Sequence, residues 1–227
     1  MHNMDFSQRV VINTLHSDWV ASPMPGVMRK PLAREDAERG HATSIVRYQP
    51  GAFFSEHDHP LGEEIFVLEG VFSDQTGDYG AGCYFRNPEG FKHAPFSKEG
   101  CLILVKLHQF QDSDHHRLVI NTQNTDWLPG IGGLQVMPLH THKAEHVALV
   151  RWPAGEQFNS HWHPAGEEIY VISGELCDEY GTYPAGTWLR NPPMSQHTPY
   201  AKKDTVIWVK AGHLDLGKQA RLSADKT

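Results

Sequence analysis

The sequence has few cysteines and no excess of positive charge, and each shortage excludes a class of protein. Its 227 residues include 3 cysteines but no CxxC pair, so we expect neither a disulfide framework nor a cysteine-based zinc site. Lysine and arginine number 20 against 27 aspartates and glutamates, and the net charge of −7 would repel a nucleic-acid backbone. We therefore expect no nucleic-acid partner.

Long apolar runs are also missing. Stretches such as residues 101–107 are much shorter than the ~18 residues that a membrane span needs, and the first ten residues lack the apolar core of a signal peptide. We therefore expect a cytoplasmic protein with no membrane partner. What the chain does contain in quantity is histidine, with 16 residues.

An internal repeat organises most of the chain. The segment GAFFSEHDHPLGEEIFVLEG, which begins at Gly51, returns as GEQFNSHWHPAGEEIYVISG at Gly155, a shift of 104 positions. About 25 of roughly 59 gapless positions are identical between the two copies, which indicates a gene duplication. Further back, residues between Asn13 and Trp19 match residues from Asn121 onward at a shift of 108.

Short runs of apolar residues between glycines and prolines indicate an all-β fold. Gly or Pro recurs about every 8 to 12 residues, which is typical of sandwiches and barrels of short antiparallel strands. No window has a sustained helical period, although residues 32–40 could form a short helical turn. Because a unit of ~100 residues has the size of a small domain, we predict two domains, residues 1–112 and 113–227.

Four ligand-type side chains recur at the same spacing in both copies. Two histidines two positions apart leave a strand on the same face, and the turn that follows them can bring a glutamate opposite. Three imidazoles and one carboxylate suit a borderline divalent ion and leave coordination positions open. We therefore predict up to one metal ion in each unit. The predicted ligands are His57, His59, Glu63 and His93 in the first unit, and His161, His163, Glu167 and His197 in the second.

The spacing around these ligands resembles the two motifs of the cupin family. The first motif is Gly, five residues, His-x-His, three or four residues, Glu, six residues, Gly, and the first copy fits it from Gly51 to Gly70. The second motif is Gly, five residues, Pro-x-Gly, two residues, His, and fits from Gly82 to His93. The second copy has Met194 where the motif has Gly, and both copies lack the closing Asn of the second motif, with Ser97 and Ala201 in its place. The resemblance implies a bicupin: two tandem double-stranded β-helix (jelly-roll) barrels, each with a metal inside its mouth.

The chain also resembles, more narrowly, the cupin domain of the ChrR family of zinc-binding anti-sigma factors. The strings GEEIFVLEGVFSD and YFRNPEGFKHAPFSKEGCLILVKL and their partners in the second copy carry this resemblance. It implies zinc as the metal, with iron, manganese and nickel as alternatives. In that family the cupin is sensory, and a separate N-terminal zinc domain with a CxxC pair holds the sigma factor. This chain has no CxxC pair, and its first unit is a cupin. A sigma-factor partner is therefore not our first expectation.

Two functions are consistent with these patterns. One is a zinc-binding sensor, regulatory or small-ligand-binding protein. The other is a metal-dependent enzyme, such as a dioxygenase or isomerase that acts on a small organic molecule, although the sequence reveals no catalytic base or nucleophile. An open pocket beside the metal would favour the enzyme, and a site closed by side chains would favour a structural metal. Either function could belong to a monomer or a homodimer.

Two further features shared by the copies leave alternatives open. Arg86 and Arg190 occupy equivalent positions, where they could hold a carboxylate substrate or form internal ion pairs. Glu64 and Glu168 should face away from the metal ligands and form salt bridges. If one barrel has become purely structural, Met194 makes the second barrel the candidate.

Overall fold

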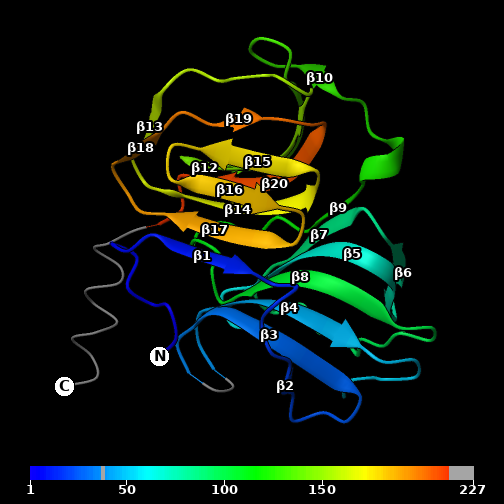
Figure 1. The fold of residues 1–227 in the computed structure, drawn as a ribbon. Helices are drawn as coiled ribbons and strands as arrows, with labels where there is room; N and C mark the ends of the chain where they lie inside the picture. The colour runs from blue at the N-terminus through cyan, green and yellow to red at the C-terminus, as the bar shows by residue number, and fades with distance from the viewer. Residues whose placement is uncertain (37–38, 215–227) are drawn as a thin grey trace, which may run out of the picture. The chain divides into compact units, whose positions relative to one another are not determined.

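A computed structural model describes residues 1–36 and 39–214 of the chain, and antiparallel strands make up nearly all of its regular structure (Figure 1). The all-β prediction is therefore confirmed. Residues 32–34, which could have formed a helical turn, lie in a strand, and residues 37–38 lie outside the described residues. Within the described ranges, no helix has the length and apolar character needed to cross a membrane.

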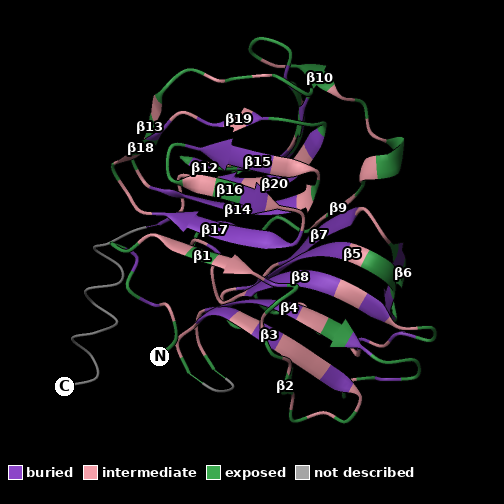
Figure 2. Cartoon of the chain, in the orientation of Figure 1, coloured by how far each residue is buried: buried purple, intermediate pink, exposed green. Residues whose placement is uncertain are grey.

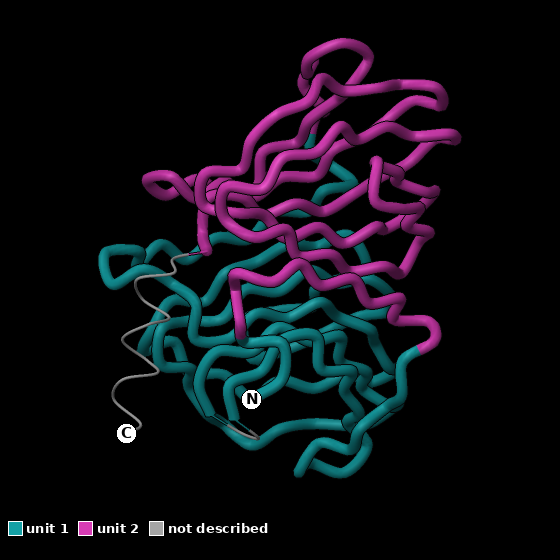
Figure 3. Tube along the Cα trace, turned by 60° about the vertical axis from the view of Figure 1, so that its left-hand side comes forward, with its two compact units in different colours: residues 1–4, 17–125 teal, residues 5–16, 126–227 magenta. Residues whose placement is uncertain are grey.

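The chain forms two compact units (Figure 3). Unit 1 contains Met1–Met4 and Ser17–Thr125, and unit 2 contains Asp5–His16 and Asp126–Thr227. Each unit therefore includes a segment from the other side of residue 112, where the repeat places the boundary. The two domains 1–112 and 113–227 stay a prediction about the duplicated segments.

Unit 1 is built on an eight-stranded antiparallel sheet. Its strands follow the order β2-β3-β4-β8-β5-β7-β9, and β6 pairs with β5. A short 3-10 helix, Thr122–Asn124, follows the last strand. The strands are β2 (Val20–Ala21), β3 (Val27–Arg34), β4 (Ala42–Tyr48), β5 (Glu63–Asp74), β6 (Gly77–Gly80), β7 (Cys83–Asn87), β8 (Cys101–Leu107) and β9 (Leu118–Asn121).

Unit 2 repeats this plan with a more divided sheet. Its seven-stranded sheet has the order β1-β17-β14-β20-β12-β11-β10, beside the pair β13-β18 and the trio β16-β15-β19. The strands are β1 (Val10–Asn13), β10 (Leu128–Pro129), β11 (Gln135–His142), β12 (Glu145–Trp152), β13 (His161–His163), β14 (Glu167–Ser173), β15 (Glu175–Asp178), β16 (Gly181–Pro184), β17 (Thr187–Asn191), β18 (Ser195–His197), β19 (Tyr200–Ala201) and β20 (Thr205–Ala211).

The edge strand of each main sheet comes from the repeated segment that precedes the other copy. In unit 2, β1 pairs with β17, from Val10 opposite Arg190 to Asn13 opposite Thr187. In unit 1, β9 pairs in the same way with β7, which is buried along its whole length (Figure 2). Because β1 and β9 are themselves repeat counterparts at a shift of 108, the duplication preserved this arrangement.

The glycine that closes the first motif is required by a close backbone approach in each unit. Gly70 and Gly174 have φ values of 71° and 81°. A Cβ atom on Gly70 would lie 2.1 Å from the carbonyl oxygen of Gly100, and one on Gly174 would lie 2.2 Å from that of Asp204. Any side chain here would push apart the strands that carry the glutamates of the two predicted sites.

Met194 takes up the turn conformation that its glycine counterpart adopts. Its φ is 65°, against 84° at Gly90, so the departure from the motif leaves the turn in place with a non-glycine residue in the left-handed region. The left-handed region costs a non-glycine residue ~1–2 kcal/mol. Glycine avoids this cost, but its greater conformational freedom in the unfolded chain offsets part of the gain. Met194→Gly should therefore raise the free energy of unfolding by about 0.5–1 kcal/mol. Urea denaturation of the purified protein measures this.

Gly90→Met is the matched control for that substitution. A Cβ atom at Gly90 would meet nothing within 4 Å, so its effect comes from the backbone alone, and we expect this variant to be destabilised. A loss of stability in Met194→Gly would contradict the prediction and show that contacts of the methionine side chain outweigh its backbone strain.

Candidate metal centres

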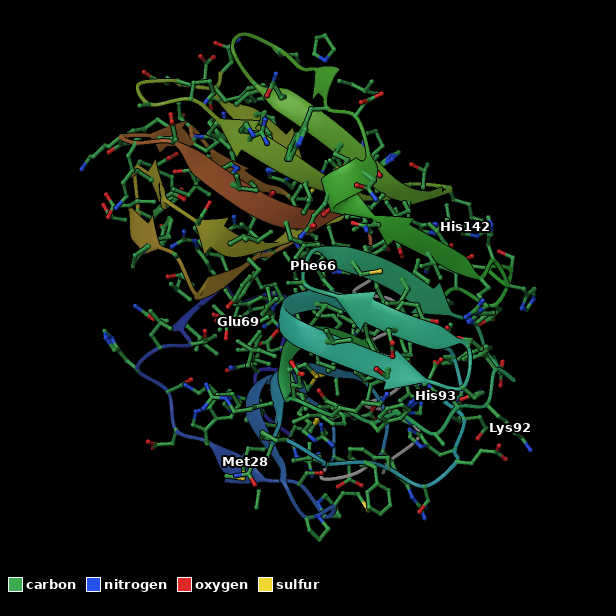
Figure 4. All side chains as sticks on the ribbon, turned by 90° about the vertical axis from the view of Figure 1, so that its right-hand side faces the viewer. Met28, Phe66, Glu69, Lys92, His93 and His142 are labelled. Carbon is green, nitrogen blue, oxygen red and sulfur yellow. The ribbon has the colours of Figure 1, made fainter. Side chains whose placement is uncertain are left out.

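Three histidines converge in unit 1. His57 and His93 exchange two backbone hydrogen bonds of 3.0 Å, so they lie directly opposite each other, and His59 follows two residues later. Their ring centroids lie 4.7 to 5.6 Å apart, and one nitrogen from each falls within 4.8 Å of the others. His93 is fully buried, whereas the neighbouring Lys92 is exposed (Figure 4).

Glu63 joins this cluster from the first position of β5. Its Oε1 lies 3.4 Å from Nε2 of His59, and its Oε2 lies 3.4 Å from Nε2 of His93. Both of these Nε2 atoms are buried without a hydrogen-bond partner in the part of the chain that the structure describes. Two atoms that each bind one ion at ~2.1 Å lie roughly 3.0–3.4 Å apart at ordinary coordination angles. The four side chains therefore fit a divalent metal ion.

The second centre has the same construction on a regular strand pair. His161 on β13 lies opposite His197 on β18, and His163 completes the triad. Nε2 of His163 lies 3.0 Å from Nε2 of His197. Oε1 of Glu167 is 3.4 Å and 3.3 Å from these same two atoms. All four residues predicted for the second unit are thus brought together.

The other ring nitrogen of one histidine in each centre lies against a backbone carbonyl that fixes the ring. Nδ1 of His57 lies 2.7 Å from the carbonyl oxygen of Ser55, and Nδ1 of His161 lies 2.9 Å from that of Asn159. An N–H donated to that carbonyl leaves Nε2 as the free acceptor, which is the arrangement that metal-binding histidines use.

Carboxylates orient the third histidine of each centre, and sequence reasoning did not single them out. Oδ2 of Asp74 lies 3.4 Å from Nδ1 of His93, and Oδ2 of Asp178 lies 3.5 Å from Nδ1 of His197. The nearby imidazoles and the hydrogen bonds from neighbouring groups outweigh burial and lower the pKa of both aspartates, so they stay ionised. The repeat carried the signal, because the two aspartates are 104 positions apart.

Two asparagines hold the glutamates in the same manner. Nδ2 of Asn87 donates to Oε2 of Glu63 at 3.1 Å, and Nδ2 of Asn191 donates to Oε1 of Glu167 at 2.7 Å. They too are repeat counterparts at a shift of 104. Supporting contacts of this kind fix the orientation of metal-binding carboxylates.

Burial keeps several of these imidazoles in the neutral form that binds metal. Burial, with His197 and His161 nearby, lowers the pKa of His163 to about 3, and burial also lowers the pKa of His59. His93 differs: burial would lower its pKa, but the carboxylates of Glu63 and Asp74 outweigh that effect and raise it. A metal ion would displace the proton that these carboxylates favour.

Aromatic rings fill the space around the first centre. Phe72 packs 6.3 Å from the ring of His93 and 5.7 Å from Tyr48, and Phe85 follows at 5.5 Å from Phe72. Phe91 adds a further ring 5.9 Å from His93. These rings form part of the wall of the first centre, and the side chains of His57 and His59 stay partly exposed.

The second centre instead opens onto a cavity of about 520 Å³, which is in the range of small-molecule pockets. The repeat explains part of this room, because Leu176 replaces Phe72 and Ala211 replaces Leu107. The cavity is lined by Pro129, Gly130, Ile131, Leu134, Val136, Val150, Trp152, Phe158, His161, His163, Glu167, Ile169, Leu176, His197, Pro199, Ile207, Val209 and Ala211.

Arg9, on the segment just before β1, connects the edge of the sheet to the second centre. Its guanidinium donates to Oδ1 of Asn191 at 2.8 Å and to Oδ2 of Asp178 at 3.1 Å. These are the residues that hold Glu167 and His197. Its repeat counterpart, Arg117, donates instead to Thr76 and Tyr79. The second centre thus receives support that its counterpart in unit 1 does not have from Arg117.

Replacing Arg9 by alanine should therefore weaken metal binding in unit 2. Loss of an outer partner of a metal ligand costs about 10–100-fold in affinity, and we expect the lower end of this range because Arg9 acts through Asn191 and Asp178. Competition with a chelator in a His59→Ala background reports the second centre. Arg117→Ala is the matched control, and an equal effect of both substitutions would contradict the assignment.

Arg86 and Arg190, which occupy equivalent positions in the two copies, lie outside both centres. Nη1 of Arg86 lies 2.7 Å from Oδ2 of Asp114, and both side chains are buried. Nη2 of Arg190 donates to the carbonyl oxygen of Asp5 at 2.8 Å, and its guanidinium lies over the ring of Phe6. Both arginines therefore have internal partners rather than a place on the cavity wall.

Comparisons with known proteins agree with this architecture. The family model described as the ChrR cupin-like domain matches the chain twice, over residues 7–111 and 115–215. No curated protein was found to match the sequence. The two matches together cover nearly the whole chain, so each half of the sequence matches that domain once.

Solved structures show the same fold at low sequence identity. A putative dioxygenase from Nostoc punctiforme is similar with a TM-score of 0.76 and 16% identity, covering 92% of this chain and 84% of that one. A bacterial pirin from Escherichia coli in complex with nickel(II) has a TM-score of 0.69 and 13% identity, covering 90% and 98%. Oxalate decarboxylase from Bacillus subtilis, whose Mn(II) centres were studied, has a TM-score of 0.63 and 15% identity, covering 90% of this chain and 77% of that one. The predicted fold of two tandem cupin barrels is confirmed.

Proposed function

We propose, from the premise that this chain belongs to the ChrR cupin-like domain family with two copies of the domain, that it is a metal-dependent enzyme acting on a small organic molecule in unit 2. The observation that carries this proposal is the cavity of about 520 Å³ whose wall includes all four predicted ligands of the second centre. A metal ion with such a cavity beside it has room to bind a small molecule as a further ligand.

The ligand residues of each unit would hold one divalent ion, with zinc as the first expectation and iron, manganese or nickel as alternatives. When bound, such an ion supplies Lewis-acid polarisation, and redox chemistry if it is iron or manganese. The chain's own residues do the rest. Asp178 and Asn191 hold His197 and Glu167 in place, and aliphatic side chains such as Val150 and Ile207 exclude water from the cavity.

The solved structures give this proposal limited support. Their printed names include a putative dioxygenase, and manganese and nickel centres occur among them. At identities of 13 to 16%, these names extend to the present chain as part of the proposal only.

Metal analysis and accessibility to azide, a small anion that binds metals, test the proposal. We expect about two ions per chain in protein purified without added metal. In cobalt(II)-loaded protein, azide should change the visible spectrum through the second centre, so that the change is lost in His163→Ala and kept in His59→Ala. Oxygen uptake and product analysis with small organic acids then test turnover. If two ions are bound but azide leaves the visible spectrum of both unchanged, the proposal of an open catalytic centre is refuted.

A regulatory protein is the second candidate, and the family match favours it. A thiol-based redox sensor is a poor fit, because all three cysteines are buried and burial raises the pKa of Cys83 and Cys101 to about 11. A regulatory role would therefore rest on the metal centres. It predicts zinc in both centres and no oxygen uptake with any substrate, whereas the enzyme predicts turnover that His163→Ala abolishes.

A further inference from the structure

We propose that unit 2 selects organic molecules with an apolar body and a single carboxylate head, with the head at the metal ligands and the body in the cavity. This inference rests on the proposed function, because it names the ligand class of the same centre. The distribution of polar groups along the cavity wall carries it.

Charged and titratable side chains occur at one end of the cavity only, and the buried Nε1 of Trp152 is the other polar side-chain atom on the wall. His161, His163, Glu167 and His197 form that end. Every other residue of the wall is aliphatic, aromatic, proline or glycine, and none carries a charge. Ile131 lines the cavity while 66% of its surface is exposed, so it marks the opening. Apart from this indole N–H, which can donate one hydrogen bond, the wall between these ends offers no polar side chain, so a charged ligand group placed there would lose water without gaining a counter-charge.

The buried cations of unit 2, and the partly exposed Arg9, have partners away from the cavity. Nζ of Lys210 lies 2.8 Å from Oε1 of Glu145, with both side chains at or near zero exposure. Arg190 donates to the backbone of Asp5, and Arg9 donates to Asp178. These cations do not line the cavity, so a second carboxylate on the ligand would find no counter-charge there.

The charge of the ligand end favours one negative group. Three neutral imidazoles and the carboxylate of Glu167 around a divalent ion leave a net charge of about +1, and the opposite charges of Asp178 and Arg9 beside them cancel. A single carboxylate head would neutralise this charge in a poorly hydrated site, where uncompensated charge is costly. A neutral hydrocarbon would leave the charge unmatched, and a dianion would carry one charge too many.

Unit 1 supplies the matched comparison within the same chain. Phe72 occupies the place of Leu176, and Leu107 occupies the place of Ala211. Phe72 packs against Tyr48 and His93, so this ring takes up space beside the first centre. Leu176→Phe and Ala211→Leu therefore introduce the larger residues of unit 1, and they should reduce the cavity without removing a metal ligand.

Calorimetry on the metal-loaded, full-length protein tests the ligand class with three probes. Acetate provides the head alone, octanoate adds an apolar chain, and octanedioate adds a second carboxylate at the far end. We expect octanoate to bind at least about tenfold more tightly than acetate, because burial of methylene groups stabilises the complex. Octanedioate should bind at least about tenfold more weakly than octanoate, because its second charge has no partner.

Variants and a competition experiment locate the bound molecule. Leu176→Phe should weaken octanoate binding at least tenfold while both metal ions stay bound, and Ala211→Leu should act in the same direction. Leu15→Phe, at a site in the same unit with 69% exposure, is the matched control and should leave binding unchanged. Octanoate should also displace azide from cobalt(II) in the second centre, which shows that its head lies at the metal ligands.

Each alternative result has a clear meaning. Equal affinity for octanoate and octanedioate would overturn the single-head class while the azide response, and with it the proposed function, stands. Octanoate that binds without displacing azide would overturn the placement of the head. If azide itself gives no spectral change, the proposed open centre fails, independently of which carboxylate binds.

Discussion

Replacing His163 by alanine is expected to remove about one metal ion per chain, and His59→Ala should remove the other. Each substitution deletes one of the three imidazoles that meet in its own unit. Because even outer partners of a metal ligand change affinity by 10–100-fold, loss of a direct ligand should weaken its centre by at least about a hundredfold. The two variant proteins should therefore bind the same number of metal ions per chain.

They should differ in every assay that needs access to the metal. Spectral change with azide and binding of octanoate should disappear in His163→Ala and persist in His59→Ala, because the cavity adjoins the second centre. Elemental analysis after dialysis measures the metal content. His115→Ala, at an exposed histidine, controls for loss of a histidine as such. Retention of two ions in both variants would show that the triads are not the metal centres.

Asp114→Ala should destabilise unit 1 although Asp114 follows residue 112 in the sequence. Oδ2 of Asp114 lies 2.7 Å from Nη1 of Arg86, and the two side chains are 2% and 0% exposed. Breaking a buried ion pair by removing one partner costs about 3–5 kcal/mol, and the nearby charge of Glu64 should place this case near about 3 kcal/mol. The guanidinium of Arg86 would remain buried with less compensation.

Urea denaturation of the metal-loaded protein measures this effect. Asp112→Ala is the matched control, because Asp112 is an exposed aspartate two residues away. The control should change the free energy of unfolding by no more than about 0.5 kcal/mol, as is usual for surface sites. Equal stability of the two variants would show that the segment after residue 112 contributes nothing to unit 1 through this pair.

The metal ligands could be predicted because their signal is local. His57 and His59 are two positions apart on one face of an extended segment, and Glu63 follows after a short turn, so spacing alone brings them close. The second copy then provided an internal comparison. Asp74 and Asp178 had the same repeat signal, but an aspartate has many surface roles, and only its position beside a histidine ring reveals its task.

The possible helical turn at residues 32–40 shows where local reasoning fails. Its first residues, 32–34, lie in β3, which pairs along its length with β4. Hydrogen bonds to a partner strand outweigh a weak local preference for a helical turn, because such preferences amount to less than ~1 kcal/mol per residue.

By itself, the sequence determined the all-β class, the duplication and the eight candidate ligands, since these follow from short-range spacing. Only the tertiary structure decided that the second centre adjoins a cavity and which strand completes which sheet. Cavity volume depends on side chains from several strands at once, and changes such as Phe72 to Leu176 look conservative until their neighbours are known. The pairing of β1 with β17 joins residues far apart in the chain, so no local pattern encodes it.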